Sequence, residues 1–572
     1  MAAGNAEIAE LFDRYADLLE IQAANPFRVR AYRNAARVVS GSSRSMADLV
    51  AEGRDLDELP GIGKDLAAKI ETIVHTGSLP QLAQLETRVP RALADLMNLP
   101  ALGPKRVKLL YSELGIRSSE DLKRALRTDA LLAIPGFGAK TAARIQAALD
   151  SRGAAQSRFK LADAEQVAEP LLAHLRGIKG IRTITVAGSF RRRRETVGDL
   201  DIVVTARRGA TVMRGFVGYD AVAEVLSQGA TRASVRLRDG MQVDLRLVPD
   251  VSYGAALYYF TGSKSHNIAV RKIAVDRGLK INEYGVHRGG RRIAGRSEEE
   301  LFASVGLPYI PPELRENRGE IEAARAGKLP TLIELRDMRG DLHAHTIASD
   351  GHDSLEAMAK AARALGYGYL AITDHSRQVR VAHGLNAKDF RAQFAAIDRL
   401  NARFKDFRLL KGAEVDILAD GRLDLPDGVL AEMDVVVAAV HYRLGLPADK
   451  QTARVLKALD NRRVRILAHP TTRLINQRPE FAAQLEKIFA AAAERGVALE
   501  INAHPDRLDL DDIHARAARD AGCKLVISTD AHGTAGLASM RFGVDQARRA
   551  WLSRENVLNT LPLDGLLKGL RR

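Results

Sequence analysis

The hydrophobic pattern divides the chain into three stretches. From residue 1 to about 150, apolar residues recur at helical spacing, with glycine and proline between the periodic segments, and this pattern predicts an all-helical region. From about 159 to 310, strand-like and helical patterns are mixed, which indicates an α/β region. In the last 240 residues, short apolar runs alternate with helical patterns, which predicts a β/α barrel.

Two short segments separate these stretches. Residues 151–158 read Ser-Arg-Gly-Ala-Ala-Gln-Ser-Arg and are typical of a linker. Segment 311–337 opens with Pro311-Pro312 and is charged and helix-prone, which indicates a connector to the barrel. A chain of 572 residues is long enough for about three to five domains.

Three similar glycine turns recur in the helical region, and each leads into a helix rich in alanine and basic residues. Glycine lets backbone N–H groups approach a phosphate, and a helix N-terminus adds partial positive charge. The turns resemble the helix-hairpin-helix motif, which grips nucleic-acid backbone without reading sequence. They read Leu59-Pro60-Gly61-Ile62-Gly63-Lys64, Leu99-Pro100-Ala101-Leu102-Gly103-Pro104-Lys105 and Ile134-Pro135-Gly136-Phe137-Gly138-Ala139-Lys140, with Gly61, Gly63, Gly103, Lys105, Gly136 and Gly138 as the expected backbone contacts.

The α/β region carries three acids that can form one centre. Asp199 and Asp201 lead into an apolar run, and side chains two apart on a strand point to the same face. Asp244 lies on a second apolar run and can complete the cluster. Three carboxylates at close range repel one another unless cations separate them, and such ligands suit Mg²⁺ bound jointly with substrate phosphates. The upstream Gly188-Ser189 and the arginines that follow favour nucleotidyl transfer with two ions.

Ten of the fourteen histidines lie in the last 240 residues. Most of them follow a short apolar run, and the carboxyl ends of successive barrel strands meet at one mouth. Imidazoles mixed with carboxylates, without thiolates, favour Mn, Zn or Fe over a structural thiolate site. The groups are His343-Ala344-His345 with Asp350, Thr373-Asp374-His375, Glu414, His441, His469-Pro470 and Asp530-Ala531-His532.

Composition narrows the class of protein. The net charge of +15 and a pI near 9.8 favour contact with a polyanion such as nucleic acid. The one cysteine, Cys523, excludes an intramolecular disulfide framework and fits a reducing compartment. The sequence has no run of 18 apolar residues, and its amino terminus lacks the features of a signal peptide. We therefore expect a cytoplasmic protein that is not bound to a membrane, and a monomer.

These residues carry a family resemblance. Residues 1 to about 315 resemble a family X DNA polymerase, similar to DNA polymerase beta, and residues 338–572 resemble a PHP (polymerase and histidinol phosphatase) domain. This order is that of the bacterial and archaeal type of family X polymerase. Beyond the acids, the resemblance rests on Tyr258-Tyr259-Phe260-Thr261-Gly262-Ser263-Lys264, Asn267, Arg271 and Asn282-Glu283-Tyr284-Gly285.

The resemblance implies a multidomain architecture with a helical helix-hairpin-helix region, an α/β nucleotidyltransferase palm with a small thumb, and a distorted, TIM-like β/α barrel. The expected boundaries are 1–85 for an amino-terminal helical DNA-binding domain, 86–150 for helix-hairpin-helix fingers, 159–255 for the palm, 256–315 for the thumb, 316–337 for a linker and 338–572 for the PHP metallo-phosphoesterase domain.

The resemblance also implies roles in the palm. Asp199 and Asp201 would hold two Mg²⁺ ions, and Asp244 would contact the catalytic one. The expected nucleotide contacts are Gly188, Ser189 and Arg192 at the triphosphate, Tyr259, Phe260 and Gly262 at the sugar, and Ser263 and Asn267, with Asn267 at the base edge; Arg271 would contact the template strand. In the run 191–194 we expect only Arg192 to face substrate, and its neighbours to lie at the surface or on DNA phosphates.

In the barrel, the resemblance implies two or three Mn²⁺ or Zn²⁺ ions and hydrolysis of DNA from its 3′ end. The expected ligands are His343, His345, Asp350, His375, Glu414, His441, His469, Asp530 and His532. Because the ligand set has no interruption, we expect an active hydrolase. His352, His383, His504 and His514 are expected at the surface or behind the ligands.

Lys69 falls where the resemblance implies a Schiff-base lysine for removal of a 5′-deoxyribose phosphate. A lysine on an amphipathic helix is also typical of a solvated or phosphate-contacting residue, and Asp65 would repel a 5′-phosphate. Both interpretations stay open from the sequence.

The sequence thus predicts a DNA polymerase with 3′-5′ exonuclease activity that uses dNTPs on gapped or primer-template DNA in repair, including base excision repair. Two alternatives stay open. The protein could be a DNA-end-binding scaffold whose barrel is structural, or a small-molecule phosphatase of the PHP type.

Overall fold

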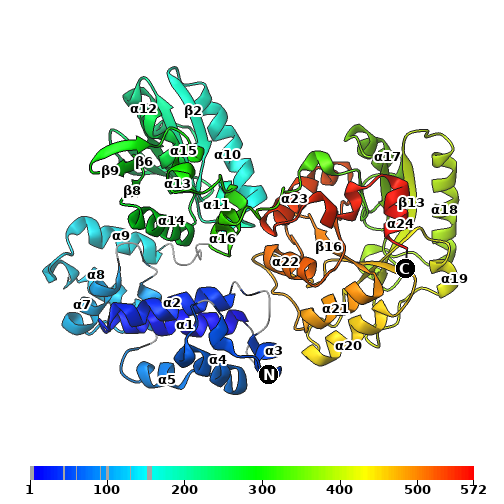
Figure 1. Cartoon of the computed structure of the whole chain (residues 1–572), viewed down its shortest axis with the longest axis horizontal. Coiled ribbons are helices and arrows are strands. Elements are labelled where there is room, and N and C mark those ends of the chain that lie inside the picture. Colours follow the sequence, from blue (N-terminus) through cyan, green and yellow to red (C-terminus); the bar gives the residue numbers. More distant parts are fainter. Residues whose placement is uncertain are drawn as a thin grey trace. The chain divides into compact units, whose positions relative to one another are not determined.

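The computed structural model describes residues 5–40, 42, 46–59, 61–90, 92–97, 99, 102–128, 130–150 and 158–571. Contacts divide the chain into two compact units, Met1–Ser157 and Arg158–Arg572 (Figure 1). The expected linker at 151–158 lies outside the described residues except for Arg158. Within the described part of the chain, no helix combines the length and apolar character needed to cross a membrane.

The first unit is helical, as the apolar spacing predicts. Its helices bury one apolar face each, and Ile8, Phe12 and Ile70 are fully buried in the shared core. The helices are α1 (Asn5–Ile21), α2 (Pro26–Ser40), α3 (Met46–Ala51), α4 (Lys64–Thr76), α5 (Pro80–Glu86), α6 (Ala92–Leu96), α7 (Pro104–Leu114), α8 (Ser119–Arg127) and α9 (Ala139–Asp150).

The three glycine turns lead into α4, α7 and α9. Gly61 and Gly136 adopt φ of +90° and +89°, a region that favours glycine. Gly63 and Gly103 are the N-caps of α4 and α7, and Gly138 accepts the first backbone hydrogen bonds of α9. Of the motif residues, Pro60, Pro100 and Ala101 lie outside the described residues.

The second unit begins with the palm, a five-stranded sheet of order β2-β4-β7-β6-β5. Its central strands β4 (Asp199–Ala206) and β7 (Gln242–Leu247) run parallel, and the other pairs are antiparallel. The remaining palm elements are β1 (Phe159–Lys160), α10 (Leu161–Arg176), β2 (Ile181–Val186), α11 (Gly188–Arg191), β3 (Thr196–Val197), α12 (Gly209–Val217), β5 (Val222–Gln228) and β6 (Arg232–Leu237).

A small thumb follows the palm. It contains helices α13 (Tyr253–Thr261), α14 (Lys264–Asp276) and α15 (Glu298–Ser304) and a three-stranded sheet of β8 (Lys280–Asn282), β9 (Gly285–Arg288) and β10 (Arg291–Ala294). The charged connector contains α16 (Glu320–Arg325), and it is not simply solvated, because Arg315 and Glu320 are fully buried.

The barrel consists of seven parallel strands in sequential order, and a bridge between Ala344 and Ala531 joins its first and last strand ends. The strands are β11 (Gly340–Asp341), β12 (Tyr369–Ile372), β13 (Arg408–Asp416), β14 (Val435–Ala439), β15 (Val464–Leu467), β16 (Ala498–Asn502) and β17 (Leu525–Ser528). The helices are α17 (Leu355–Ala364), α18 (Ala387–Asn401), α19 (Asp427–Leu430), α20 (Ala448–Leu459), α21 (Leu485–Arg495), α22 (Asp512–Asp520), α23 (Met540–Arg549) and α24 (Leu563–Gly569).

Alternate residues of the barrel strands β12 to β17 belong to two apolar cores. Along β14, Val436 and Ala438 pack with the surrounding helices. Val435 and Val437 belong instead to a second cluster that includes Leu566 of α24. The strands are therefore buried on both faces, which explains why they read as continuous apolar runs.

Candidate metal centres

The three palm acids converge on the parallel strand pair. Asp199 and Asp201 lie two apart on β4, and Asp244 of β7 is the register partner of Asp201. Burial, followed by the charges of Asp199 and Asp244, raises the pKa of Asp201 to about 7. Burial and the charge of Asp244 also raise the pKa of Asp199. Because burial and mutual repulsion disfavour ionisation of these carboxyl groups, the site is suited to divalent cations, whose positive charge would offset the carboxylates.

Asp244 is held in place by hydrogen bonds. The Ser234 hydroxyl donates to one carboxylate oxygen, and the Gln242 Nε2 donates to the other at 3.0 Å. The Arg232 guanidinium approaches Asp244 to 3.6 Å. Gln242, two positions before Asp244 on the same strand, therefore orients the carboxylate on which the metal assignment depends.

The Gly188 turn touches the acids. Gly188 adopts φ of +63°, and a Cβ built on it would lie 2.9 Å from Asp201 Oδ2. The Ala187 N–H donates to the Asp201 carbonyl at 2.6 Å. Helix α11 starts at Gly188, so the backbone N–H groups of Gly188 and Ser189 lie at a helix N-terminus beside the carboxylates.

The arginine run is not a surface feature, and the expectation for Arg191 and Arg193 was wrong. Arg191 donates to both Glu298 oxygens, at 2.9 and 2.7 Å, and Arg193 pairs with Asp545 and Glu165. Buried acids that lie more than a hundred residues away, or on another element, hold these side chains, and a local charge pattern cannot reveal such partners. Arg192 is held by Glu316 and the Thr261 carbonyl, and its positive charge partly opposes the rise of the Asp201 pKa that burial causes.

The other expected nucleotide contacts lie on α13 and α14. Tyr259 is one of the exposed large apolar residues, Ser263 caps α14, and Arg271 is exposed. The Asn267 amide donates to the Tyr259 carbonyl at 2.8 Å, while its buried Oδ1 has no hydrogen-bond partner among the described residues. Phe260 packs under the Arg246 guanidinium, 4.8 Å from the ring centroid.

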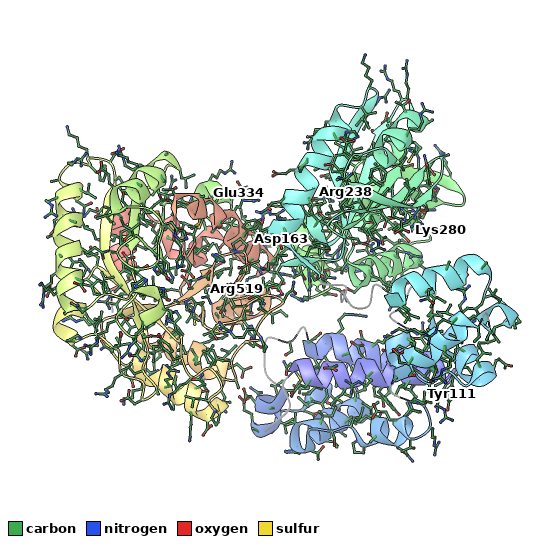
Figure 2. All side chains as sticks on the ribbon, turned by 180° about the vertical axis from the view of Figure 1, so that it is seen from behind. Tyr111, Asp163, Arg238, Lys280, Glu334 and Arg519 are labelled. Atoms are coloured by element: carbon green, nitrogen blue, oxygen red, sulfur yellow. The ribbon has the colours of Figure 1, made fainter. Side chains whose placement is uncertain are left out.

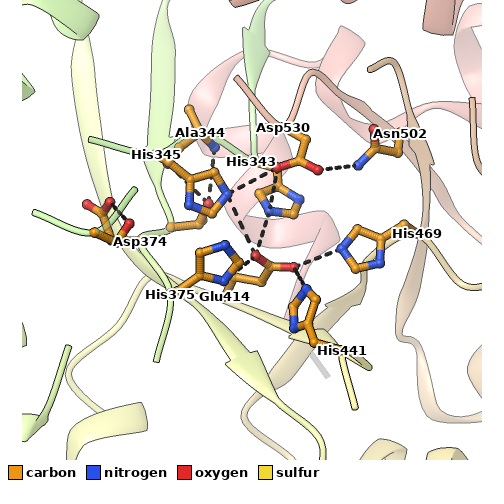
Figure 3. A network of polar contacts seen from close by, with 12 residues as sticks. His343, Ala344, His345, Asp374, His375, Glu414, His441, His469, Asn502 and Asp530 are labelled. Carbon is orange, nitrogen blue, oxygen red and sulfur yellow. Dashed lines mark hydrogen bonds and ion pairs between the residues drawn. The ribbon is translucent and has the colours of Figure 1, made fainter. Parts of the chain in front are cut away.

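All nine expected barrel ligands lie together near the carboxyl ends of the strands, and Figure 3 labels His343, His345, His375, Glu414, His441, His469 and Asp530. Glu414 lies at the centre, 2.9 Å from His375 Nδ1, 3.2 Å from His441 Nε2 and 2.8 Å from His469 Nε2. Among the described residues, three groups place their ligand atoms within 4.8 Å of one another, and the palm acids do not form such a group: His345, Asp350, His375 and His532; His343, His345 and Asp530; His375, Glu414 and His441.

The electrostatics of the barrel mouth favour cations. Burial opposes protonation of His375 and His441, but the carboxylate of Glu414 outweighs it and the pKa rises to about 10 for His375 and to about 9 for His441, whereas burial lowers the pKa of His345 and His469. His343 Nε2 and His345 Nδ1 are buried without a hydrogen-bond partner in the described part of the chain. Imidazole nitrogens that lack a hydrogen-bond partner and lie among carboxylates fit divalent metals, which would replace the bound protons.

Sequence reasoning missed the residues that support the ligands. Glu500 lies 2.8 Å from His343 Nδ1, and Asp416 lies 3.0 Å from His441 Nδ1. Asp374 accepts the Thr346 N–H at 2.8 Å and so fixes the loop before Asp350. The available signal was position, because Asp416 lies two residues after Glu414 on β13, and Glu500 lies on β16, between the strands β15 and β17 that precede other expected ligands.

Arg507 was also missed. It lines a cavity of about 180 Å³ together with the ligands, and its Nε lies 3.4 Å from Asp530 Oδ2. The apolar side chains of Val379 and Val381 line the same cavity, and Val381 is 89% exposed. The mouth therefore combines the expected metal ligands, the guanidinium of Arg507 and an apolar rim.

In the helical unit, Lys69 is buried on α4. Its Nζ lies 5.9 Å from the Tyr32 ring centroid and donates to the Asp65 carboxylate. Burial acts to lower the pKa of Lys69, but Asp65 outweighs it and the pKa is raised. A raised pKa keeps the amine protonated, which is the opposite of what a Schiff-base nucleophile needs. The lyase assignment stays a prediction.

Four sequence families match parts of the chain. They are a helix-hairpin-helix domain at residues 3–79, a SAM-like helix-hairpin-helix tandem at 93–151, the DNA polymerase beta thumb at 256–316 and the PHP domain at 341–504.

Similar proteins follow the same division. The chain is 40% identical over 570 residues to the DNA polymerase/3′-5′ exonuclease PolX of Bacillus subtilis, which covers 99% of each protein. It is 25% identical over 342 residues, 54% of this chain and 56% of the relative, to DNA polymerase lambda of Rattus norvegicus. A probable phosphatase of Thermoanaerobacter sp. is 29% identical over 232 residues, 38% of this chain and 89% of that protein.

Proposed function

Because the chain belongs to the family of DNA polymerase/3′-5′ exonuclease PolX, we propose that its palm adds deoxynucleotides to primer 3′-hydroxyls in short gaps and its barrel hydrolyses DNA from the 3′ end. The observation that carries the polymerase assignment is the register of Asp201 and Asp244 on parallel strands, with Asp199 on the same face.

Two Mg²⁺ ions held by Asp199, Asp201 and Asp244 would supply Lewis-acid stabilisation of the charge that develops on the reacting oxygens. The chain's own groups bind and orient the nucleotide. The N–H of Gly188 and the hydroxyl of Ser189 receive the triphosphate at the helix N-terminus, and Arg192 neutralises its charge. Tyr259, Phe260, Gly262, Ser263 and Asn267 enclose the sugar and base, and Arg271 contacts the template.

In the barrel, the nine ligands would hold two or three Mn²⁺ or Zn²⁺ ions, which would supply a hydroxide at neutral pH for phosphodiester hydrolysis. Arg507 provides a positive charge for the scissile phosphate at the wall of the same cavity. Val381 offers an exposed apolar surface for a terminal nucleobase.

The helical unit binds the DNA backbone independently of base sequence. Three glycine turns precede helix N-termini, and glycine at these positions leaves open space for a phosphate, since a Cβ built on Gly63, Gly103 or Gly138 meets no atom within 4 Å. Contact with backbone alone suits an enzyme that acts on gaps of any sequence. We propose action as a monomer on gapped or primer-template DNA.

Crossed variants test the division of labour between the two centres. Asp201→Ala should abolish extension of a primer across a one-nucleotide gap and keep 3′-end degradation. His343→Ala should do the reverse. Extension by Asp201→Ala at the wild-type rate would overturn the polymerase assignment, and undiminished degradation by His343→Ala would overturn the exonuclease assignment.

The likeness of the barrel to probable phosphatases supports a second candidate activity, hydrolysis of small phosphomonoesters. p-Nitrophenyl phosphate separates the two. If the barrel acts mainly on DNA, single-stranded oligonucleotide should compete strongly with this substrate. An unchanged rate in the presence of saturating oligonucleotide would favour the phosphatase.

A further inference from the structure

Within the second unit, the barrel contacts the palm and thumb through helix α23 and through the loops that carry Ile475 and Leu508. The side chains of Ile475, Leu508 and Phe542 join the apolar core of the palm. Around them lie ion pairs between the domains, including Arg541 with Glu165 and Arg548 with Glu313, the latter at 2.8 Å. Figure 2 labels Asp163 on α10, the helix that carries Glu165, and Arg519 on the barrel helix α22. The interface is thus both apolar and charged.

Arg549, the last residue of α23, differs from the other interface arginines in what it touches. Its Nη1 donates to the backbone carbonyl of Arg192 at 2.7 Å and to Glu316 Oε1 at 3.2 Å. Its Nη2 donates to Asp512 at 2.7 Å, and Asp512 also accepts from Arg318. Arg549 is 4% exposed. A barrel residue therefore holds the backbone of the turn that carries the expected triphosphate-binding arginine.

Glu316 connects the two guanidinium groups. The same oxygen that accepts from Arg549 accepts from Arg192 Nε at 3.0 Å, and Arg192 Nη1 donates to the Thr261 carbonyl. Within the described part of the chain, no protein acceptor meets Arg192 Nη2. Two nitrogens of the Arg192 guanidinium are thus held by the protein.

The negative charge of Glu316 is balanced by Arg549 and Arg192 together. Burial opposes ionisation of Glu316, but Arg549, then Arg192 and Arg194, outweigh it and lower its pKa to about 2. One carboxylate shared by two guanidinium groups holds Arg192 in place without neutralising it fully. With Arg549 absent, Glu316 would pair with Arg192 alone, and the freed Arg192 carbonyl would lose its donor.

We propose that Arg549 of the barrel is a positioning residue for nucleotide addition in the palm, acting through Glu316 and the Arg192 backbone to present Arg192 to the triphosphate. The proposal rests on the proposed role of Arg192. It also makes the barrel a structural part of the polymerase site, independent of its own metals.

Steady-state kinetics on gapped DNA test this coupling. Arg549→Met should raise the KM for dNTP about tenfold, with the KM for DNA unchanged, and Arg549→Lys should restore part of the loss. Inorganic tripolyphosphate, used as a competitive inhibitor, should lose affinity in parallel. The double variant Arg192→Met/Arg549→Met should be no worse than Arg192→Met alone, because the two act as one unit.

Arg548→Met is the matched control. It removes the adjacent arginine of α23 and its interdomain pair with Glu313, but Arg548 does not contact Arg192 or Glu316. It should leave the KM for dNTP unchanged. Exonuclease rate and melting temperature, measured on each variant, report whether the domains remain folded; if Arg549→Met does not fold, Glu316→Gln and Arg549→Lys carry the test.

The outcomes separate the two proposals. If Arg192→Met leaves the KM for dNTP unchanged, the assigned role of Arg192 fails, and the coupling fails with it. If Arg192→Met raises that KM while the Arg549 variants behave like Arg548→Met, or if the effects of Arg192 and Arg549 simply add, the coupling alone is overturned.

Discussion

His343 and Glu500 form a buried pair at the barrel mouth, with 2.8 Å between Nδ1 and Oε1. The other ring nitrogen of His343 faces Glu414 at 3.4 Å. A carboxylate on one nitrogen fixes the tautomer that leaves the other nitrogen free for a metal. Glu500 also accepts the His469 N–H at 2.7 Å, so it aligns two of the expected ligands at once.

Glu500→Gln should therefore weaken metal binding in the barrel by about ten- to a hundredfold. The measurement is the Mn²⁺ concentration that gives half-maximal 3′-end degradation. Added Mn²⁺ should recover the rate, and gap filling should not change. Glu494→Gln, on the exposed side of α21, is the control. A Glu500→Gln enzyme with the wild-type Mn²⁺ midpoint would contradict the role given to Glu500.

The raised pKa of Asp201 predicts a pH-dependent palm. Because its pKa is about 7 in the folded protein against an ordinary value of 3.8, the metal-free fold binds this proton more tightly than the unfolded chain does. The free energy of unfolding of the metal-free protein should therefore fall as pH rises toward 7. Below that pH, a cation that binds the Asp201 carboxylate must displace its proton.

Gap filling should accordingly need more Mg²⁺ at about pH 6 than at about pH 8, by up to about tenfold in the midpoint concentration. The midpoint, measured at both pH values with saturating DNA and dNTP, checks this expectation. Equal midpoints at the two pH values would show that Asp201 is already ionised in the mildly acidic buffer.

Gly188→Ala should damage the palm specifically. The new Cβ would lie 2.9 Å from Asp201 Oδ2, and the φ of +63° adds strain. Displacing a metal-binding carboxylate by a fraction of an ångström should lower gap filling by about a hundredfold. Gly240→Ala is matched, because its φ is +92° but its Cβ meets no atom within 4 Å. Equal losses in both variants would point to backbone strain alone.

Glu298→Ala should destabilise the thumb. Glu298 accepts from Arg191 and from the fully buried Arg315, and its removal leaves two guanidinium groups without their carboxylate, at a cost of about 3–5 kcal/mol. The melting temperature measured by calorimetry should fall, while the exposed neighbour variant Glu299→Ala should melt like the wild type. An unshifted Glu298→Ala transition would contradict this account.

The stabilisation that the Glu298 carboxylate provides should depend on pH. Burial opposes ionisation of Glu298, but hydrogen bonds and charge from Arg191 and Arg315 lower its pKa below the ordinary 4.5. Its contribution is therefore fully present above pH 4.5 and is lost as pH falls through the lower folded value. The difference in melting temperature between wild type and Glu298→Ala should shrink on acidification below that point.

Much of the architecture could be predicted because the spacing of apolar residues along the chain follows the period of each helix or strand. Helical spacing marks α1 to α9, and the continuous apolar runs mark the barrel strands, since each is buried on both faces. The acids of β4 could be paired because a strand repeats every two residues. Strand ends that carry histidines had to meet once the strands were parallel, so the barrel ligands were also within reach of the sequence.

The sequence by itself thus determined the three acids, the nine residues expected as barrel ligands and the glycine turns. Only the tertiary structure decided what surrounds them: Glu298 beside Arg191, Glu500 beside His343, and Arg549 beside Arg192. The physical reason is distance along the chain. An amphipathic period or a motif reflects neighbours within a few residues, whereas these ion pairs and hydrogen bonds join groups more than a hundred residues apart. Only the packing of whole elements brings such groups together.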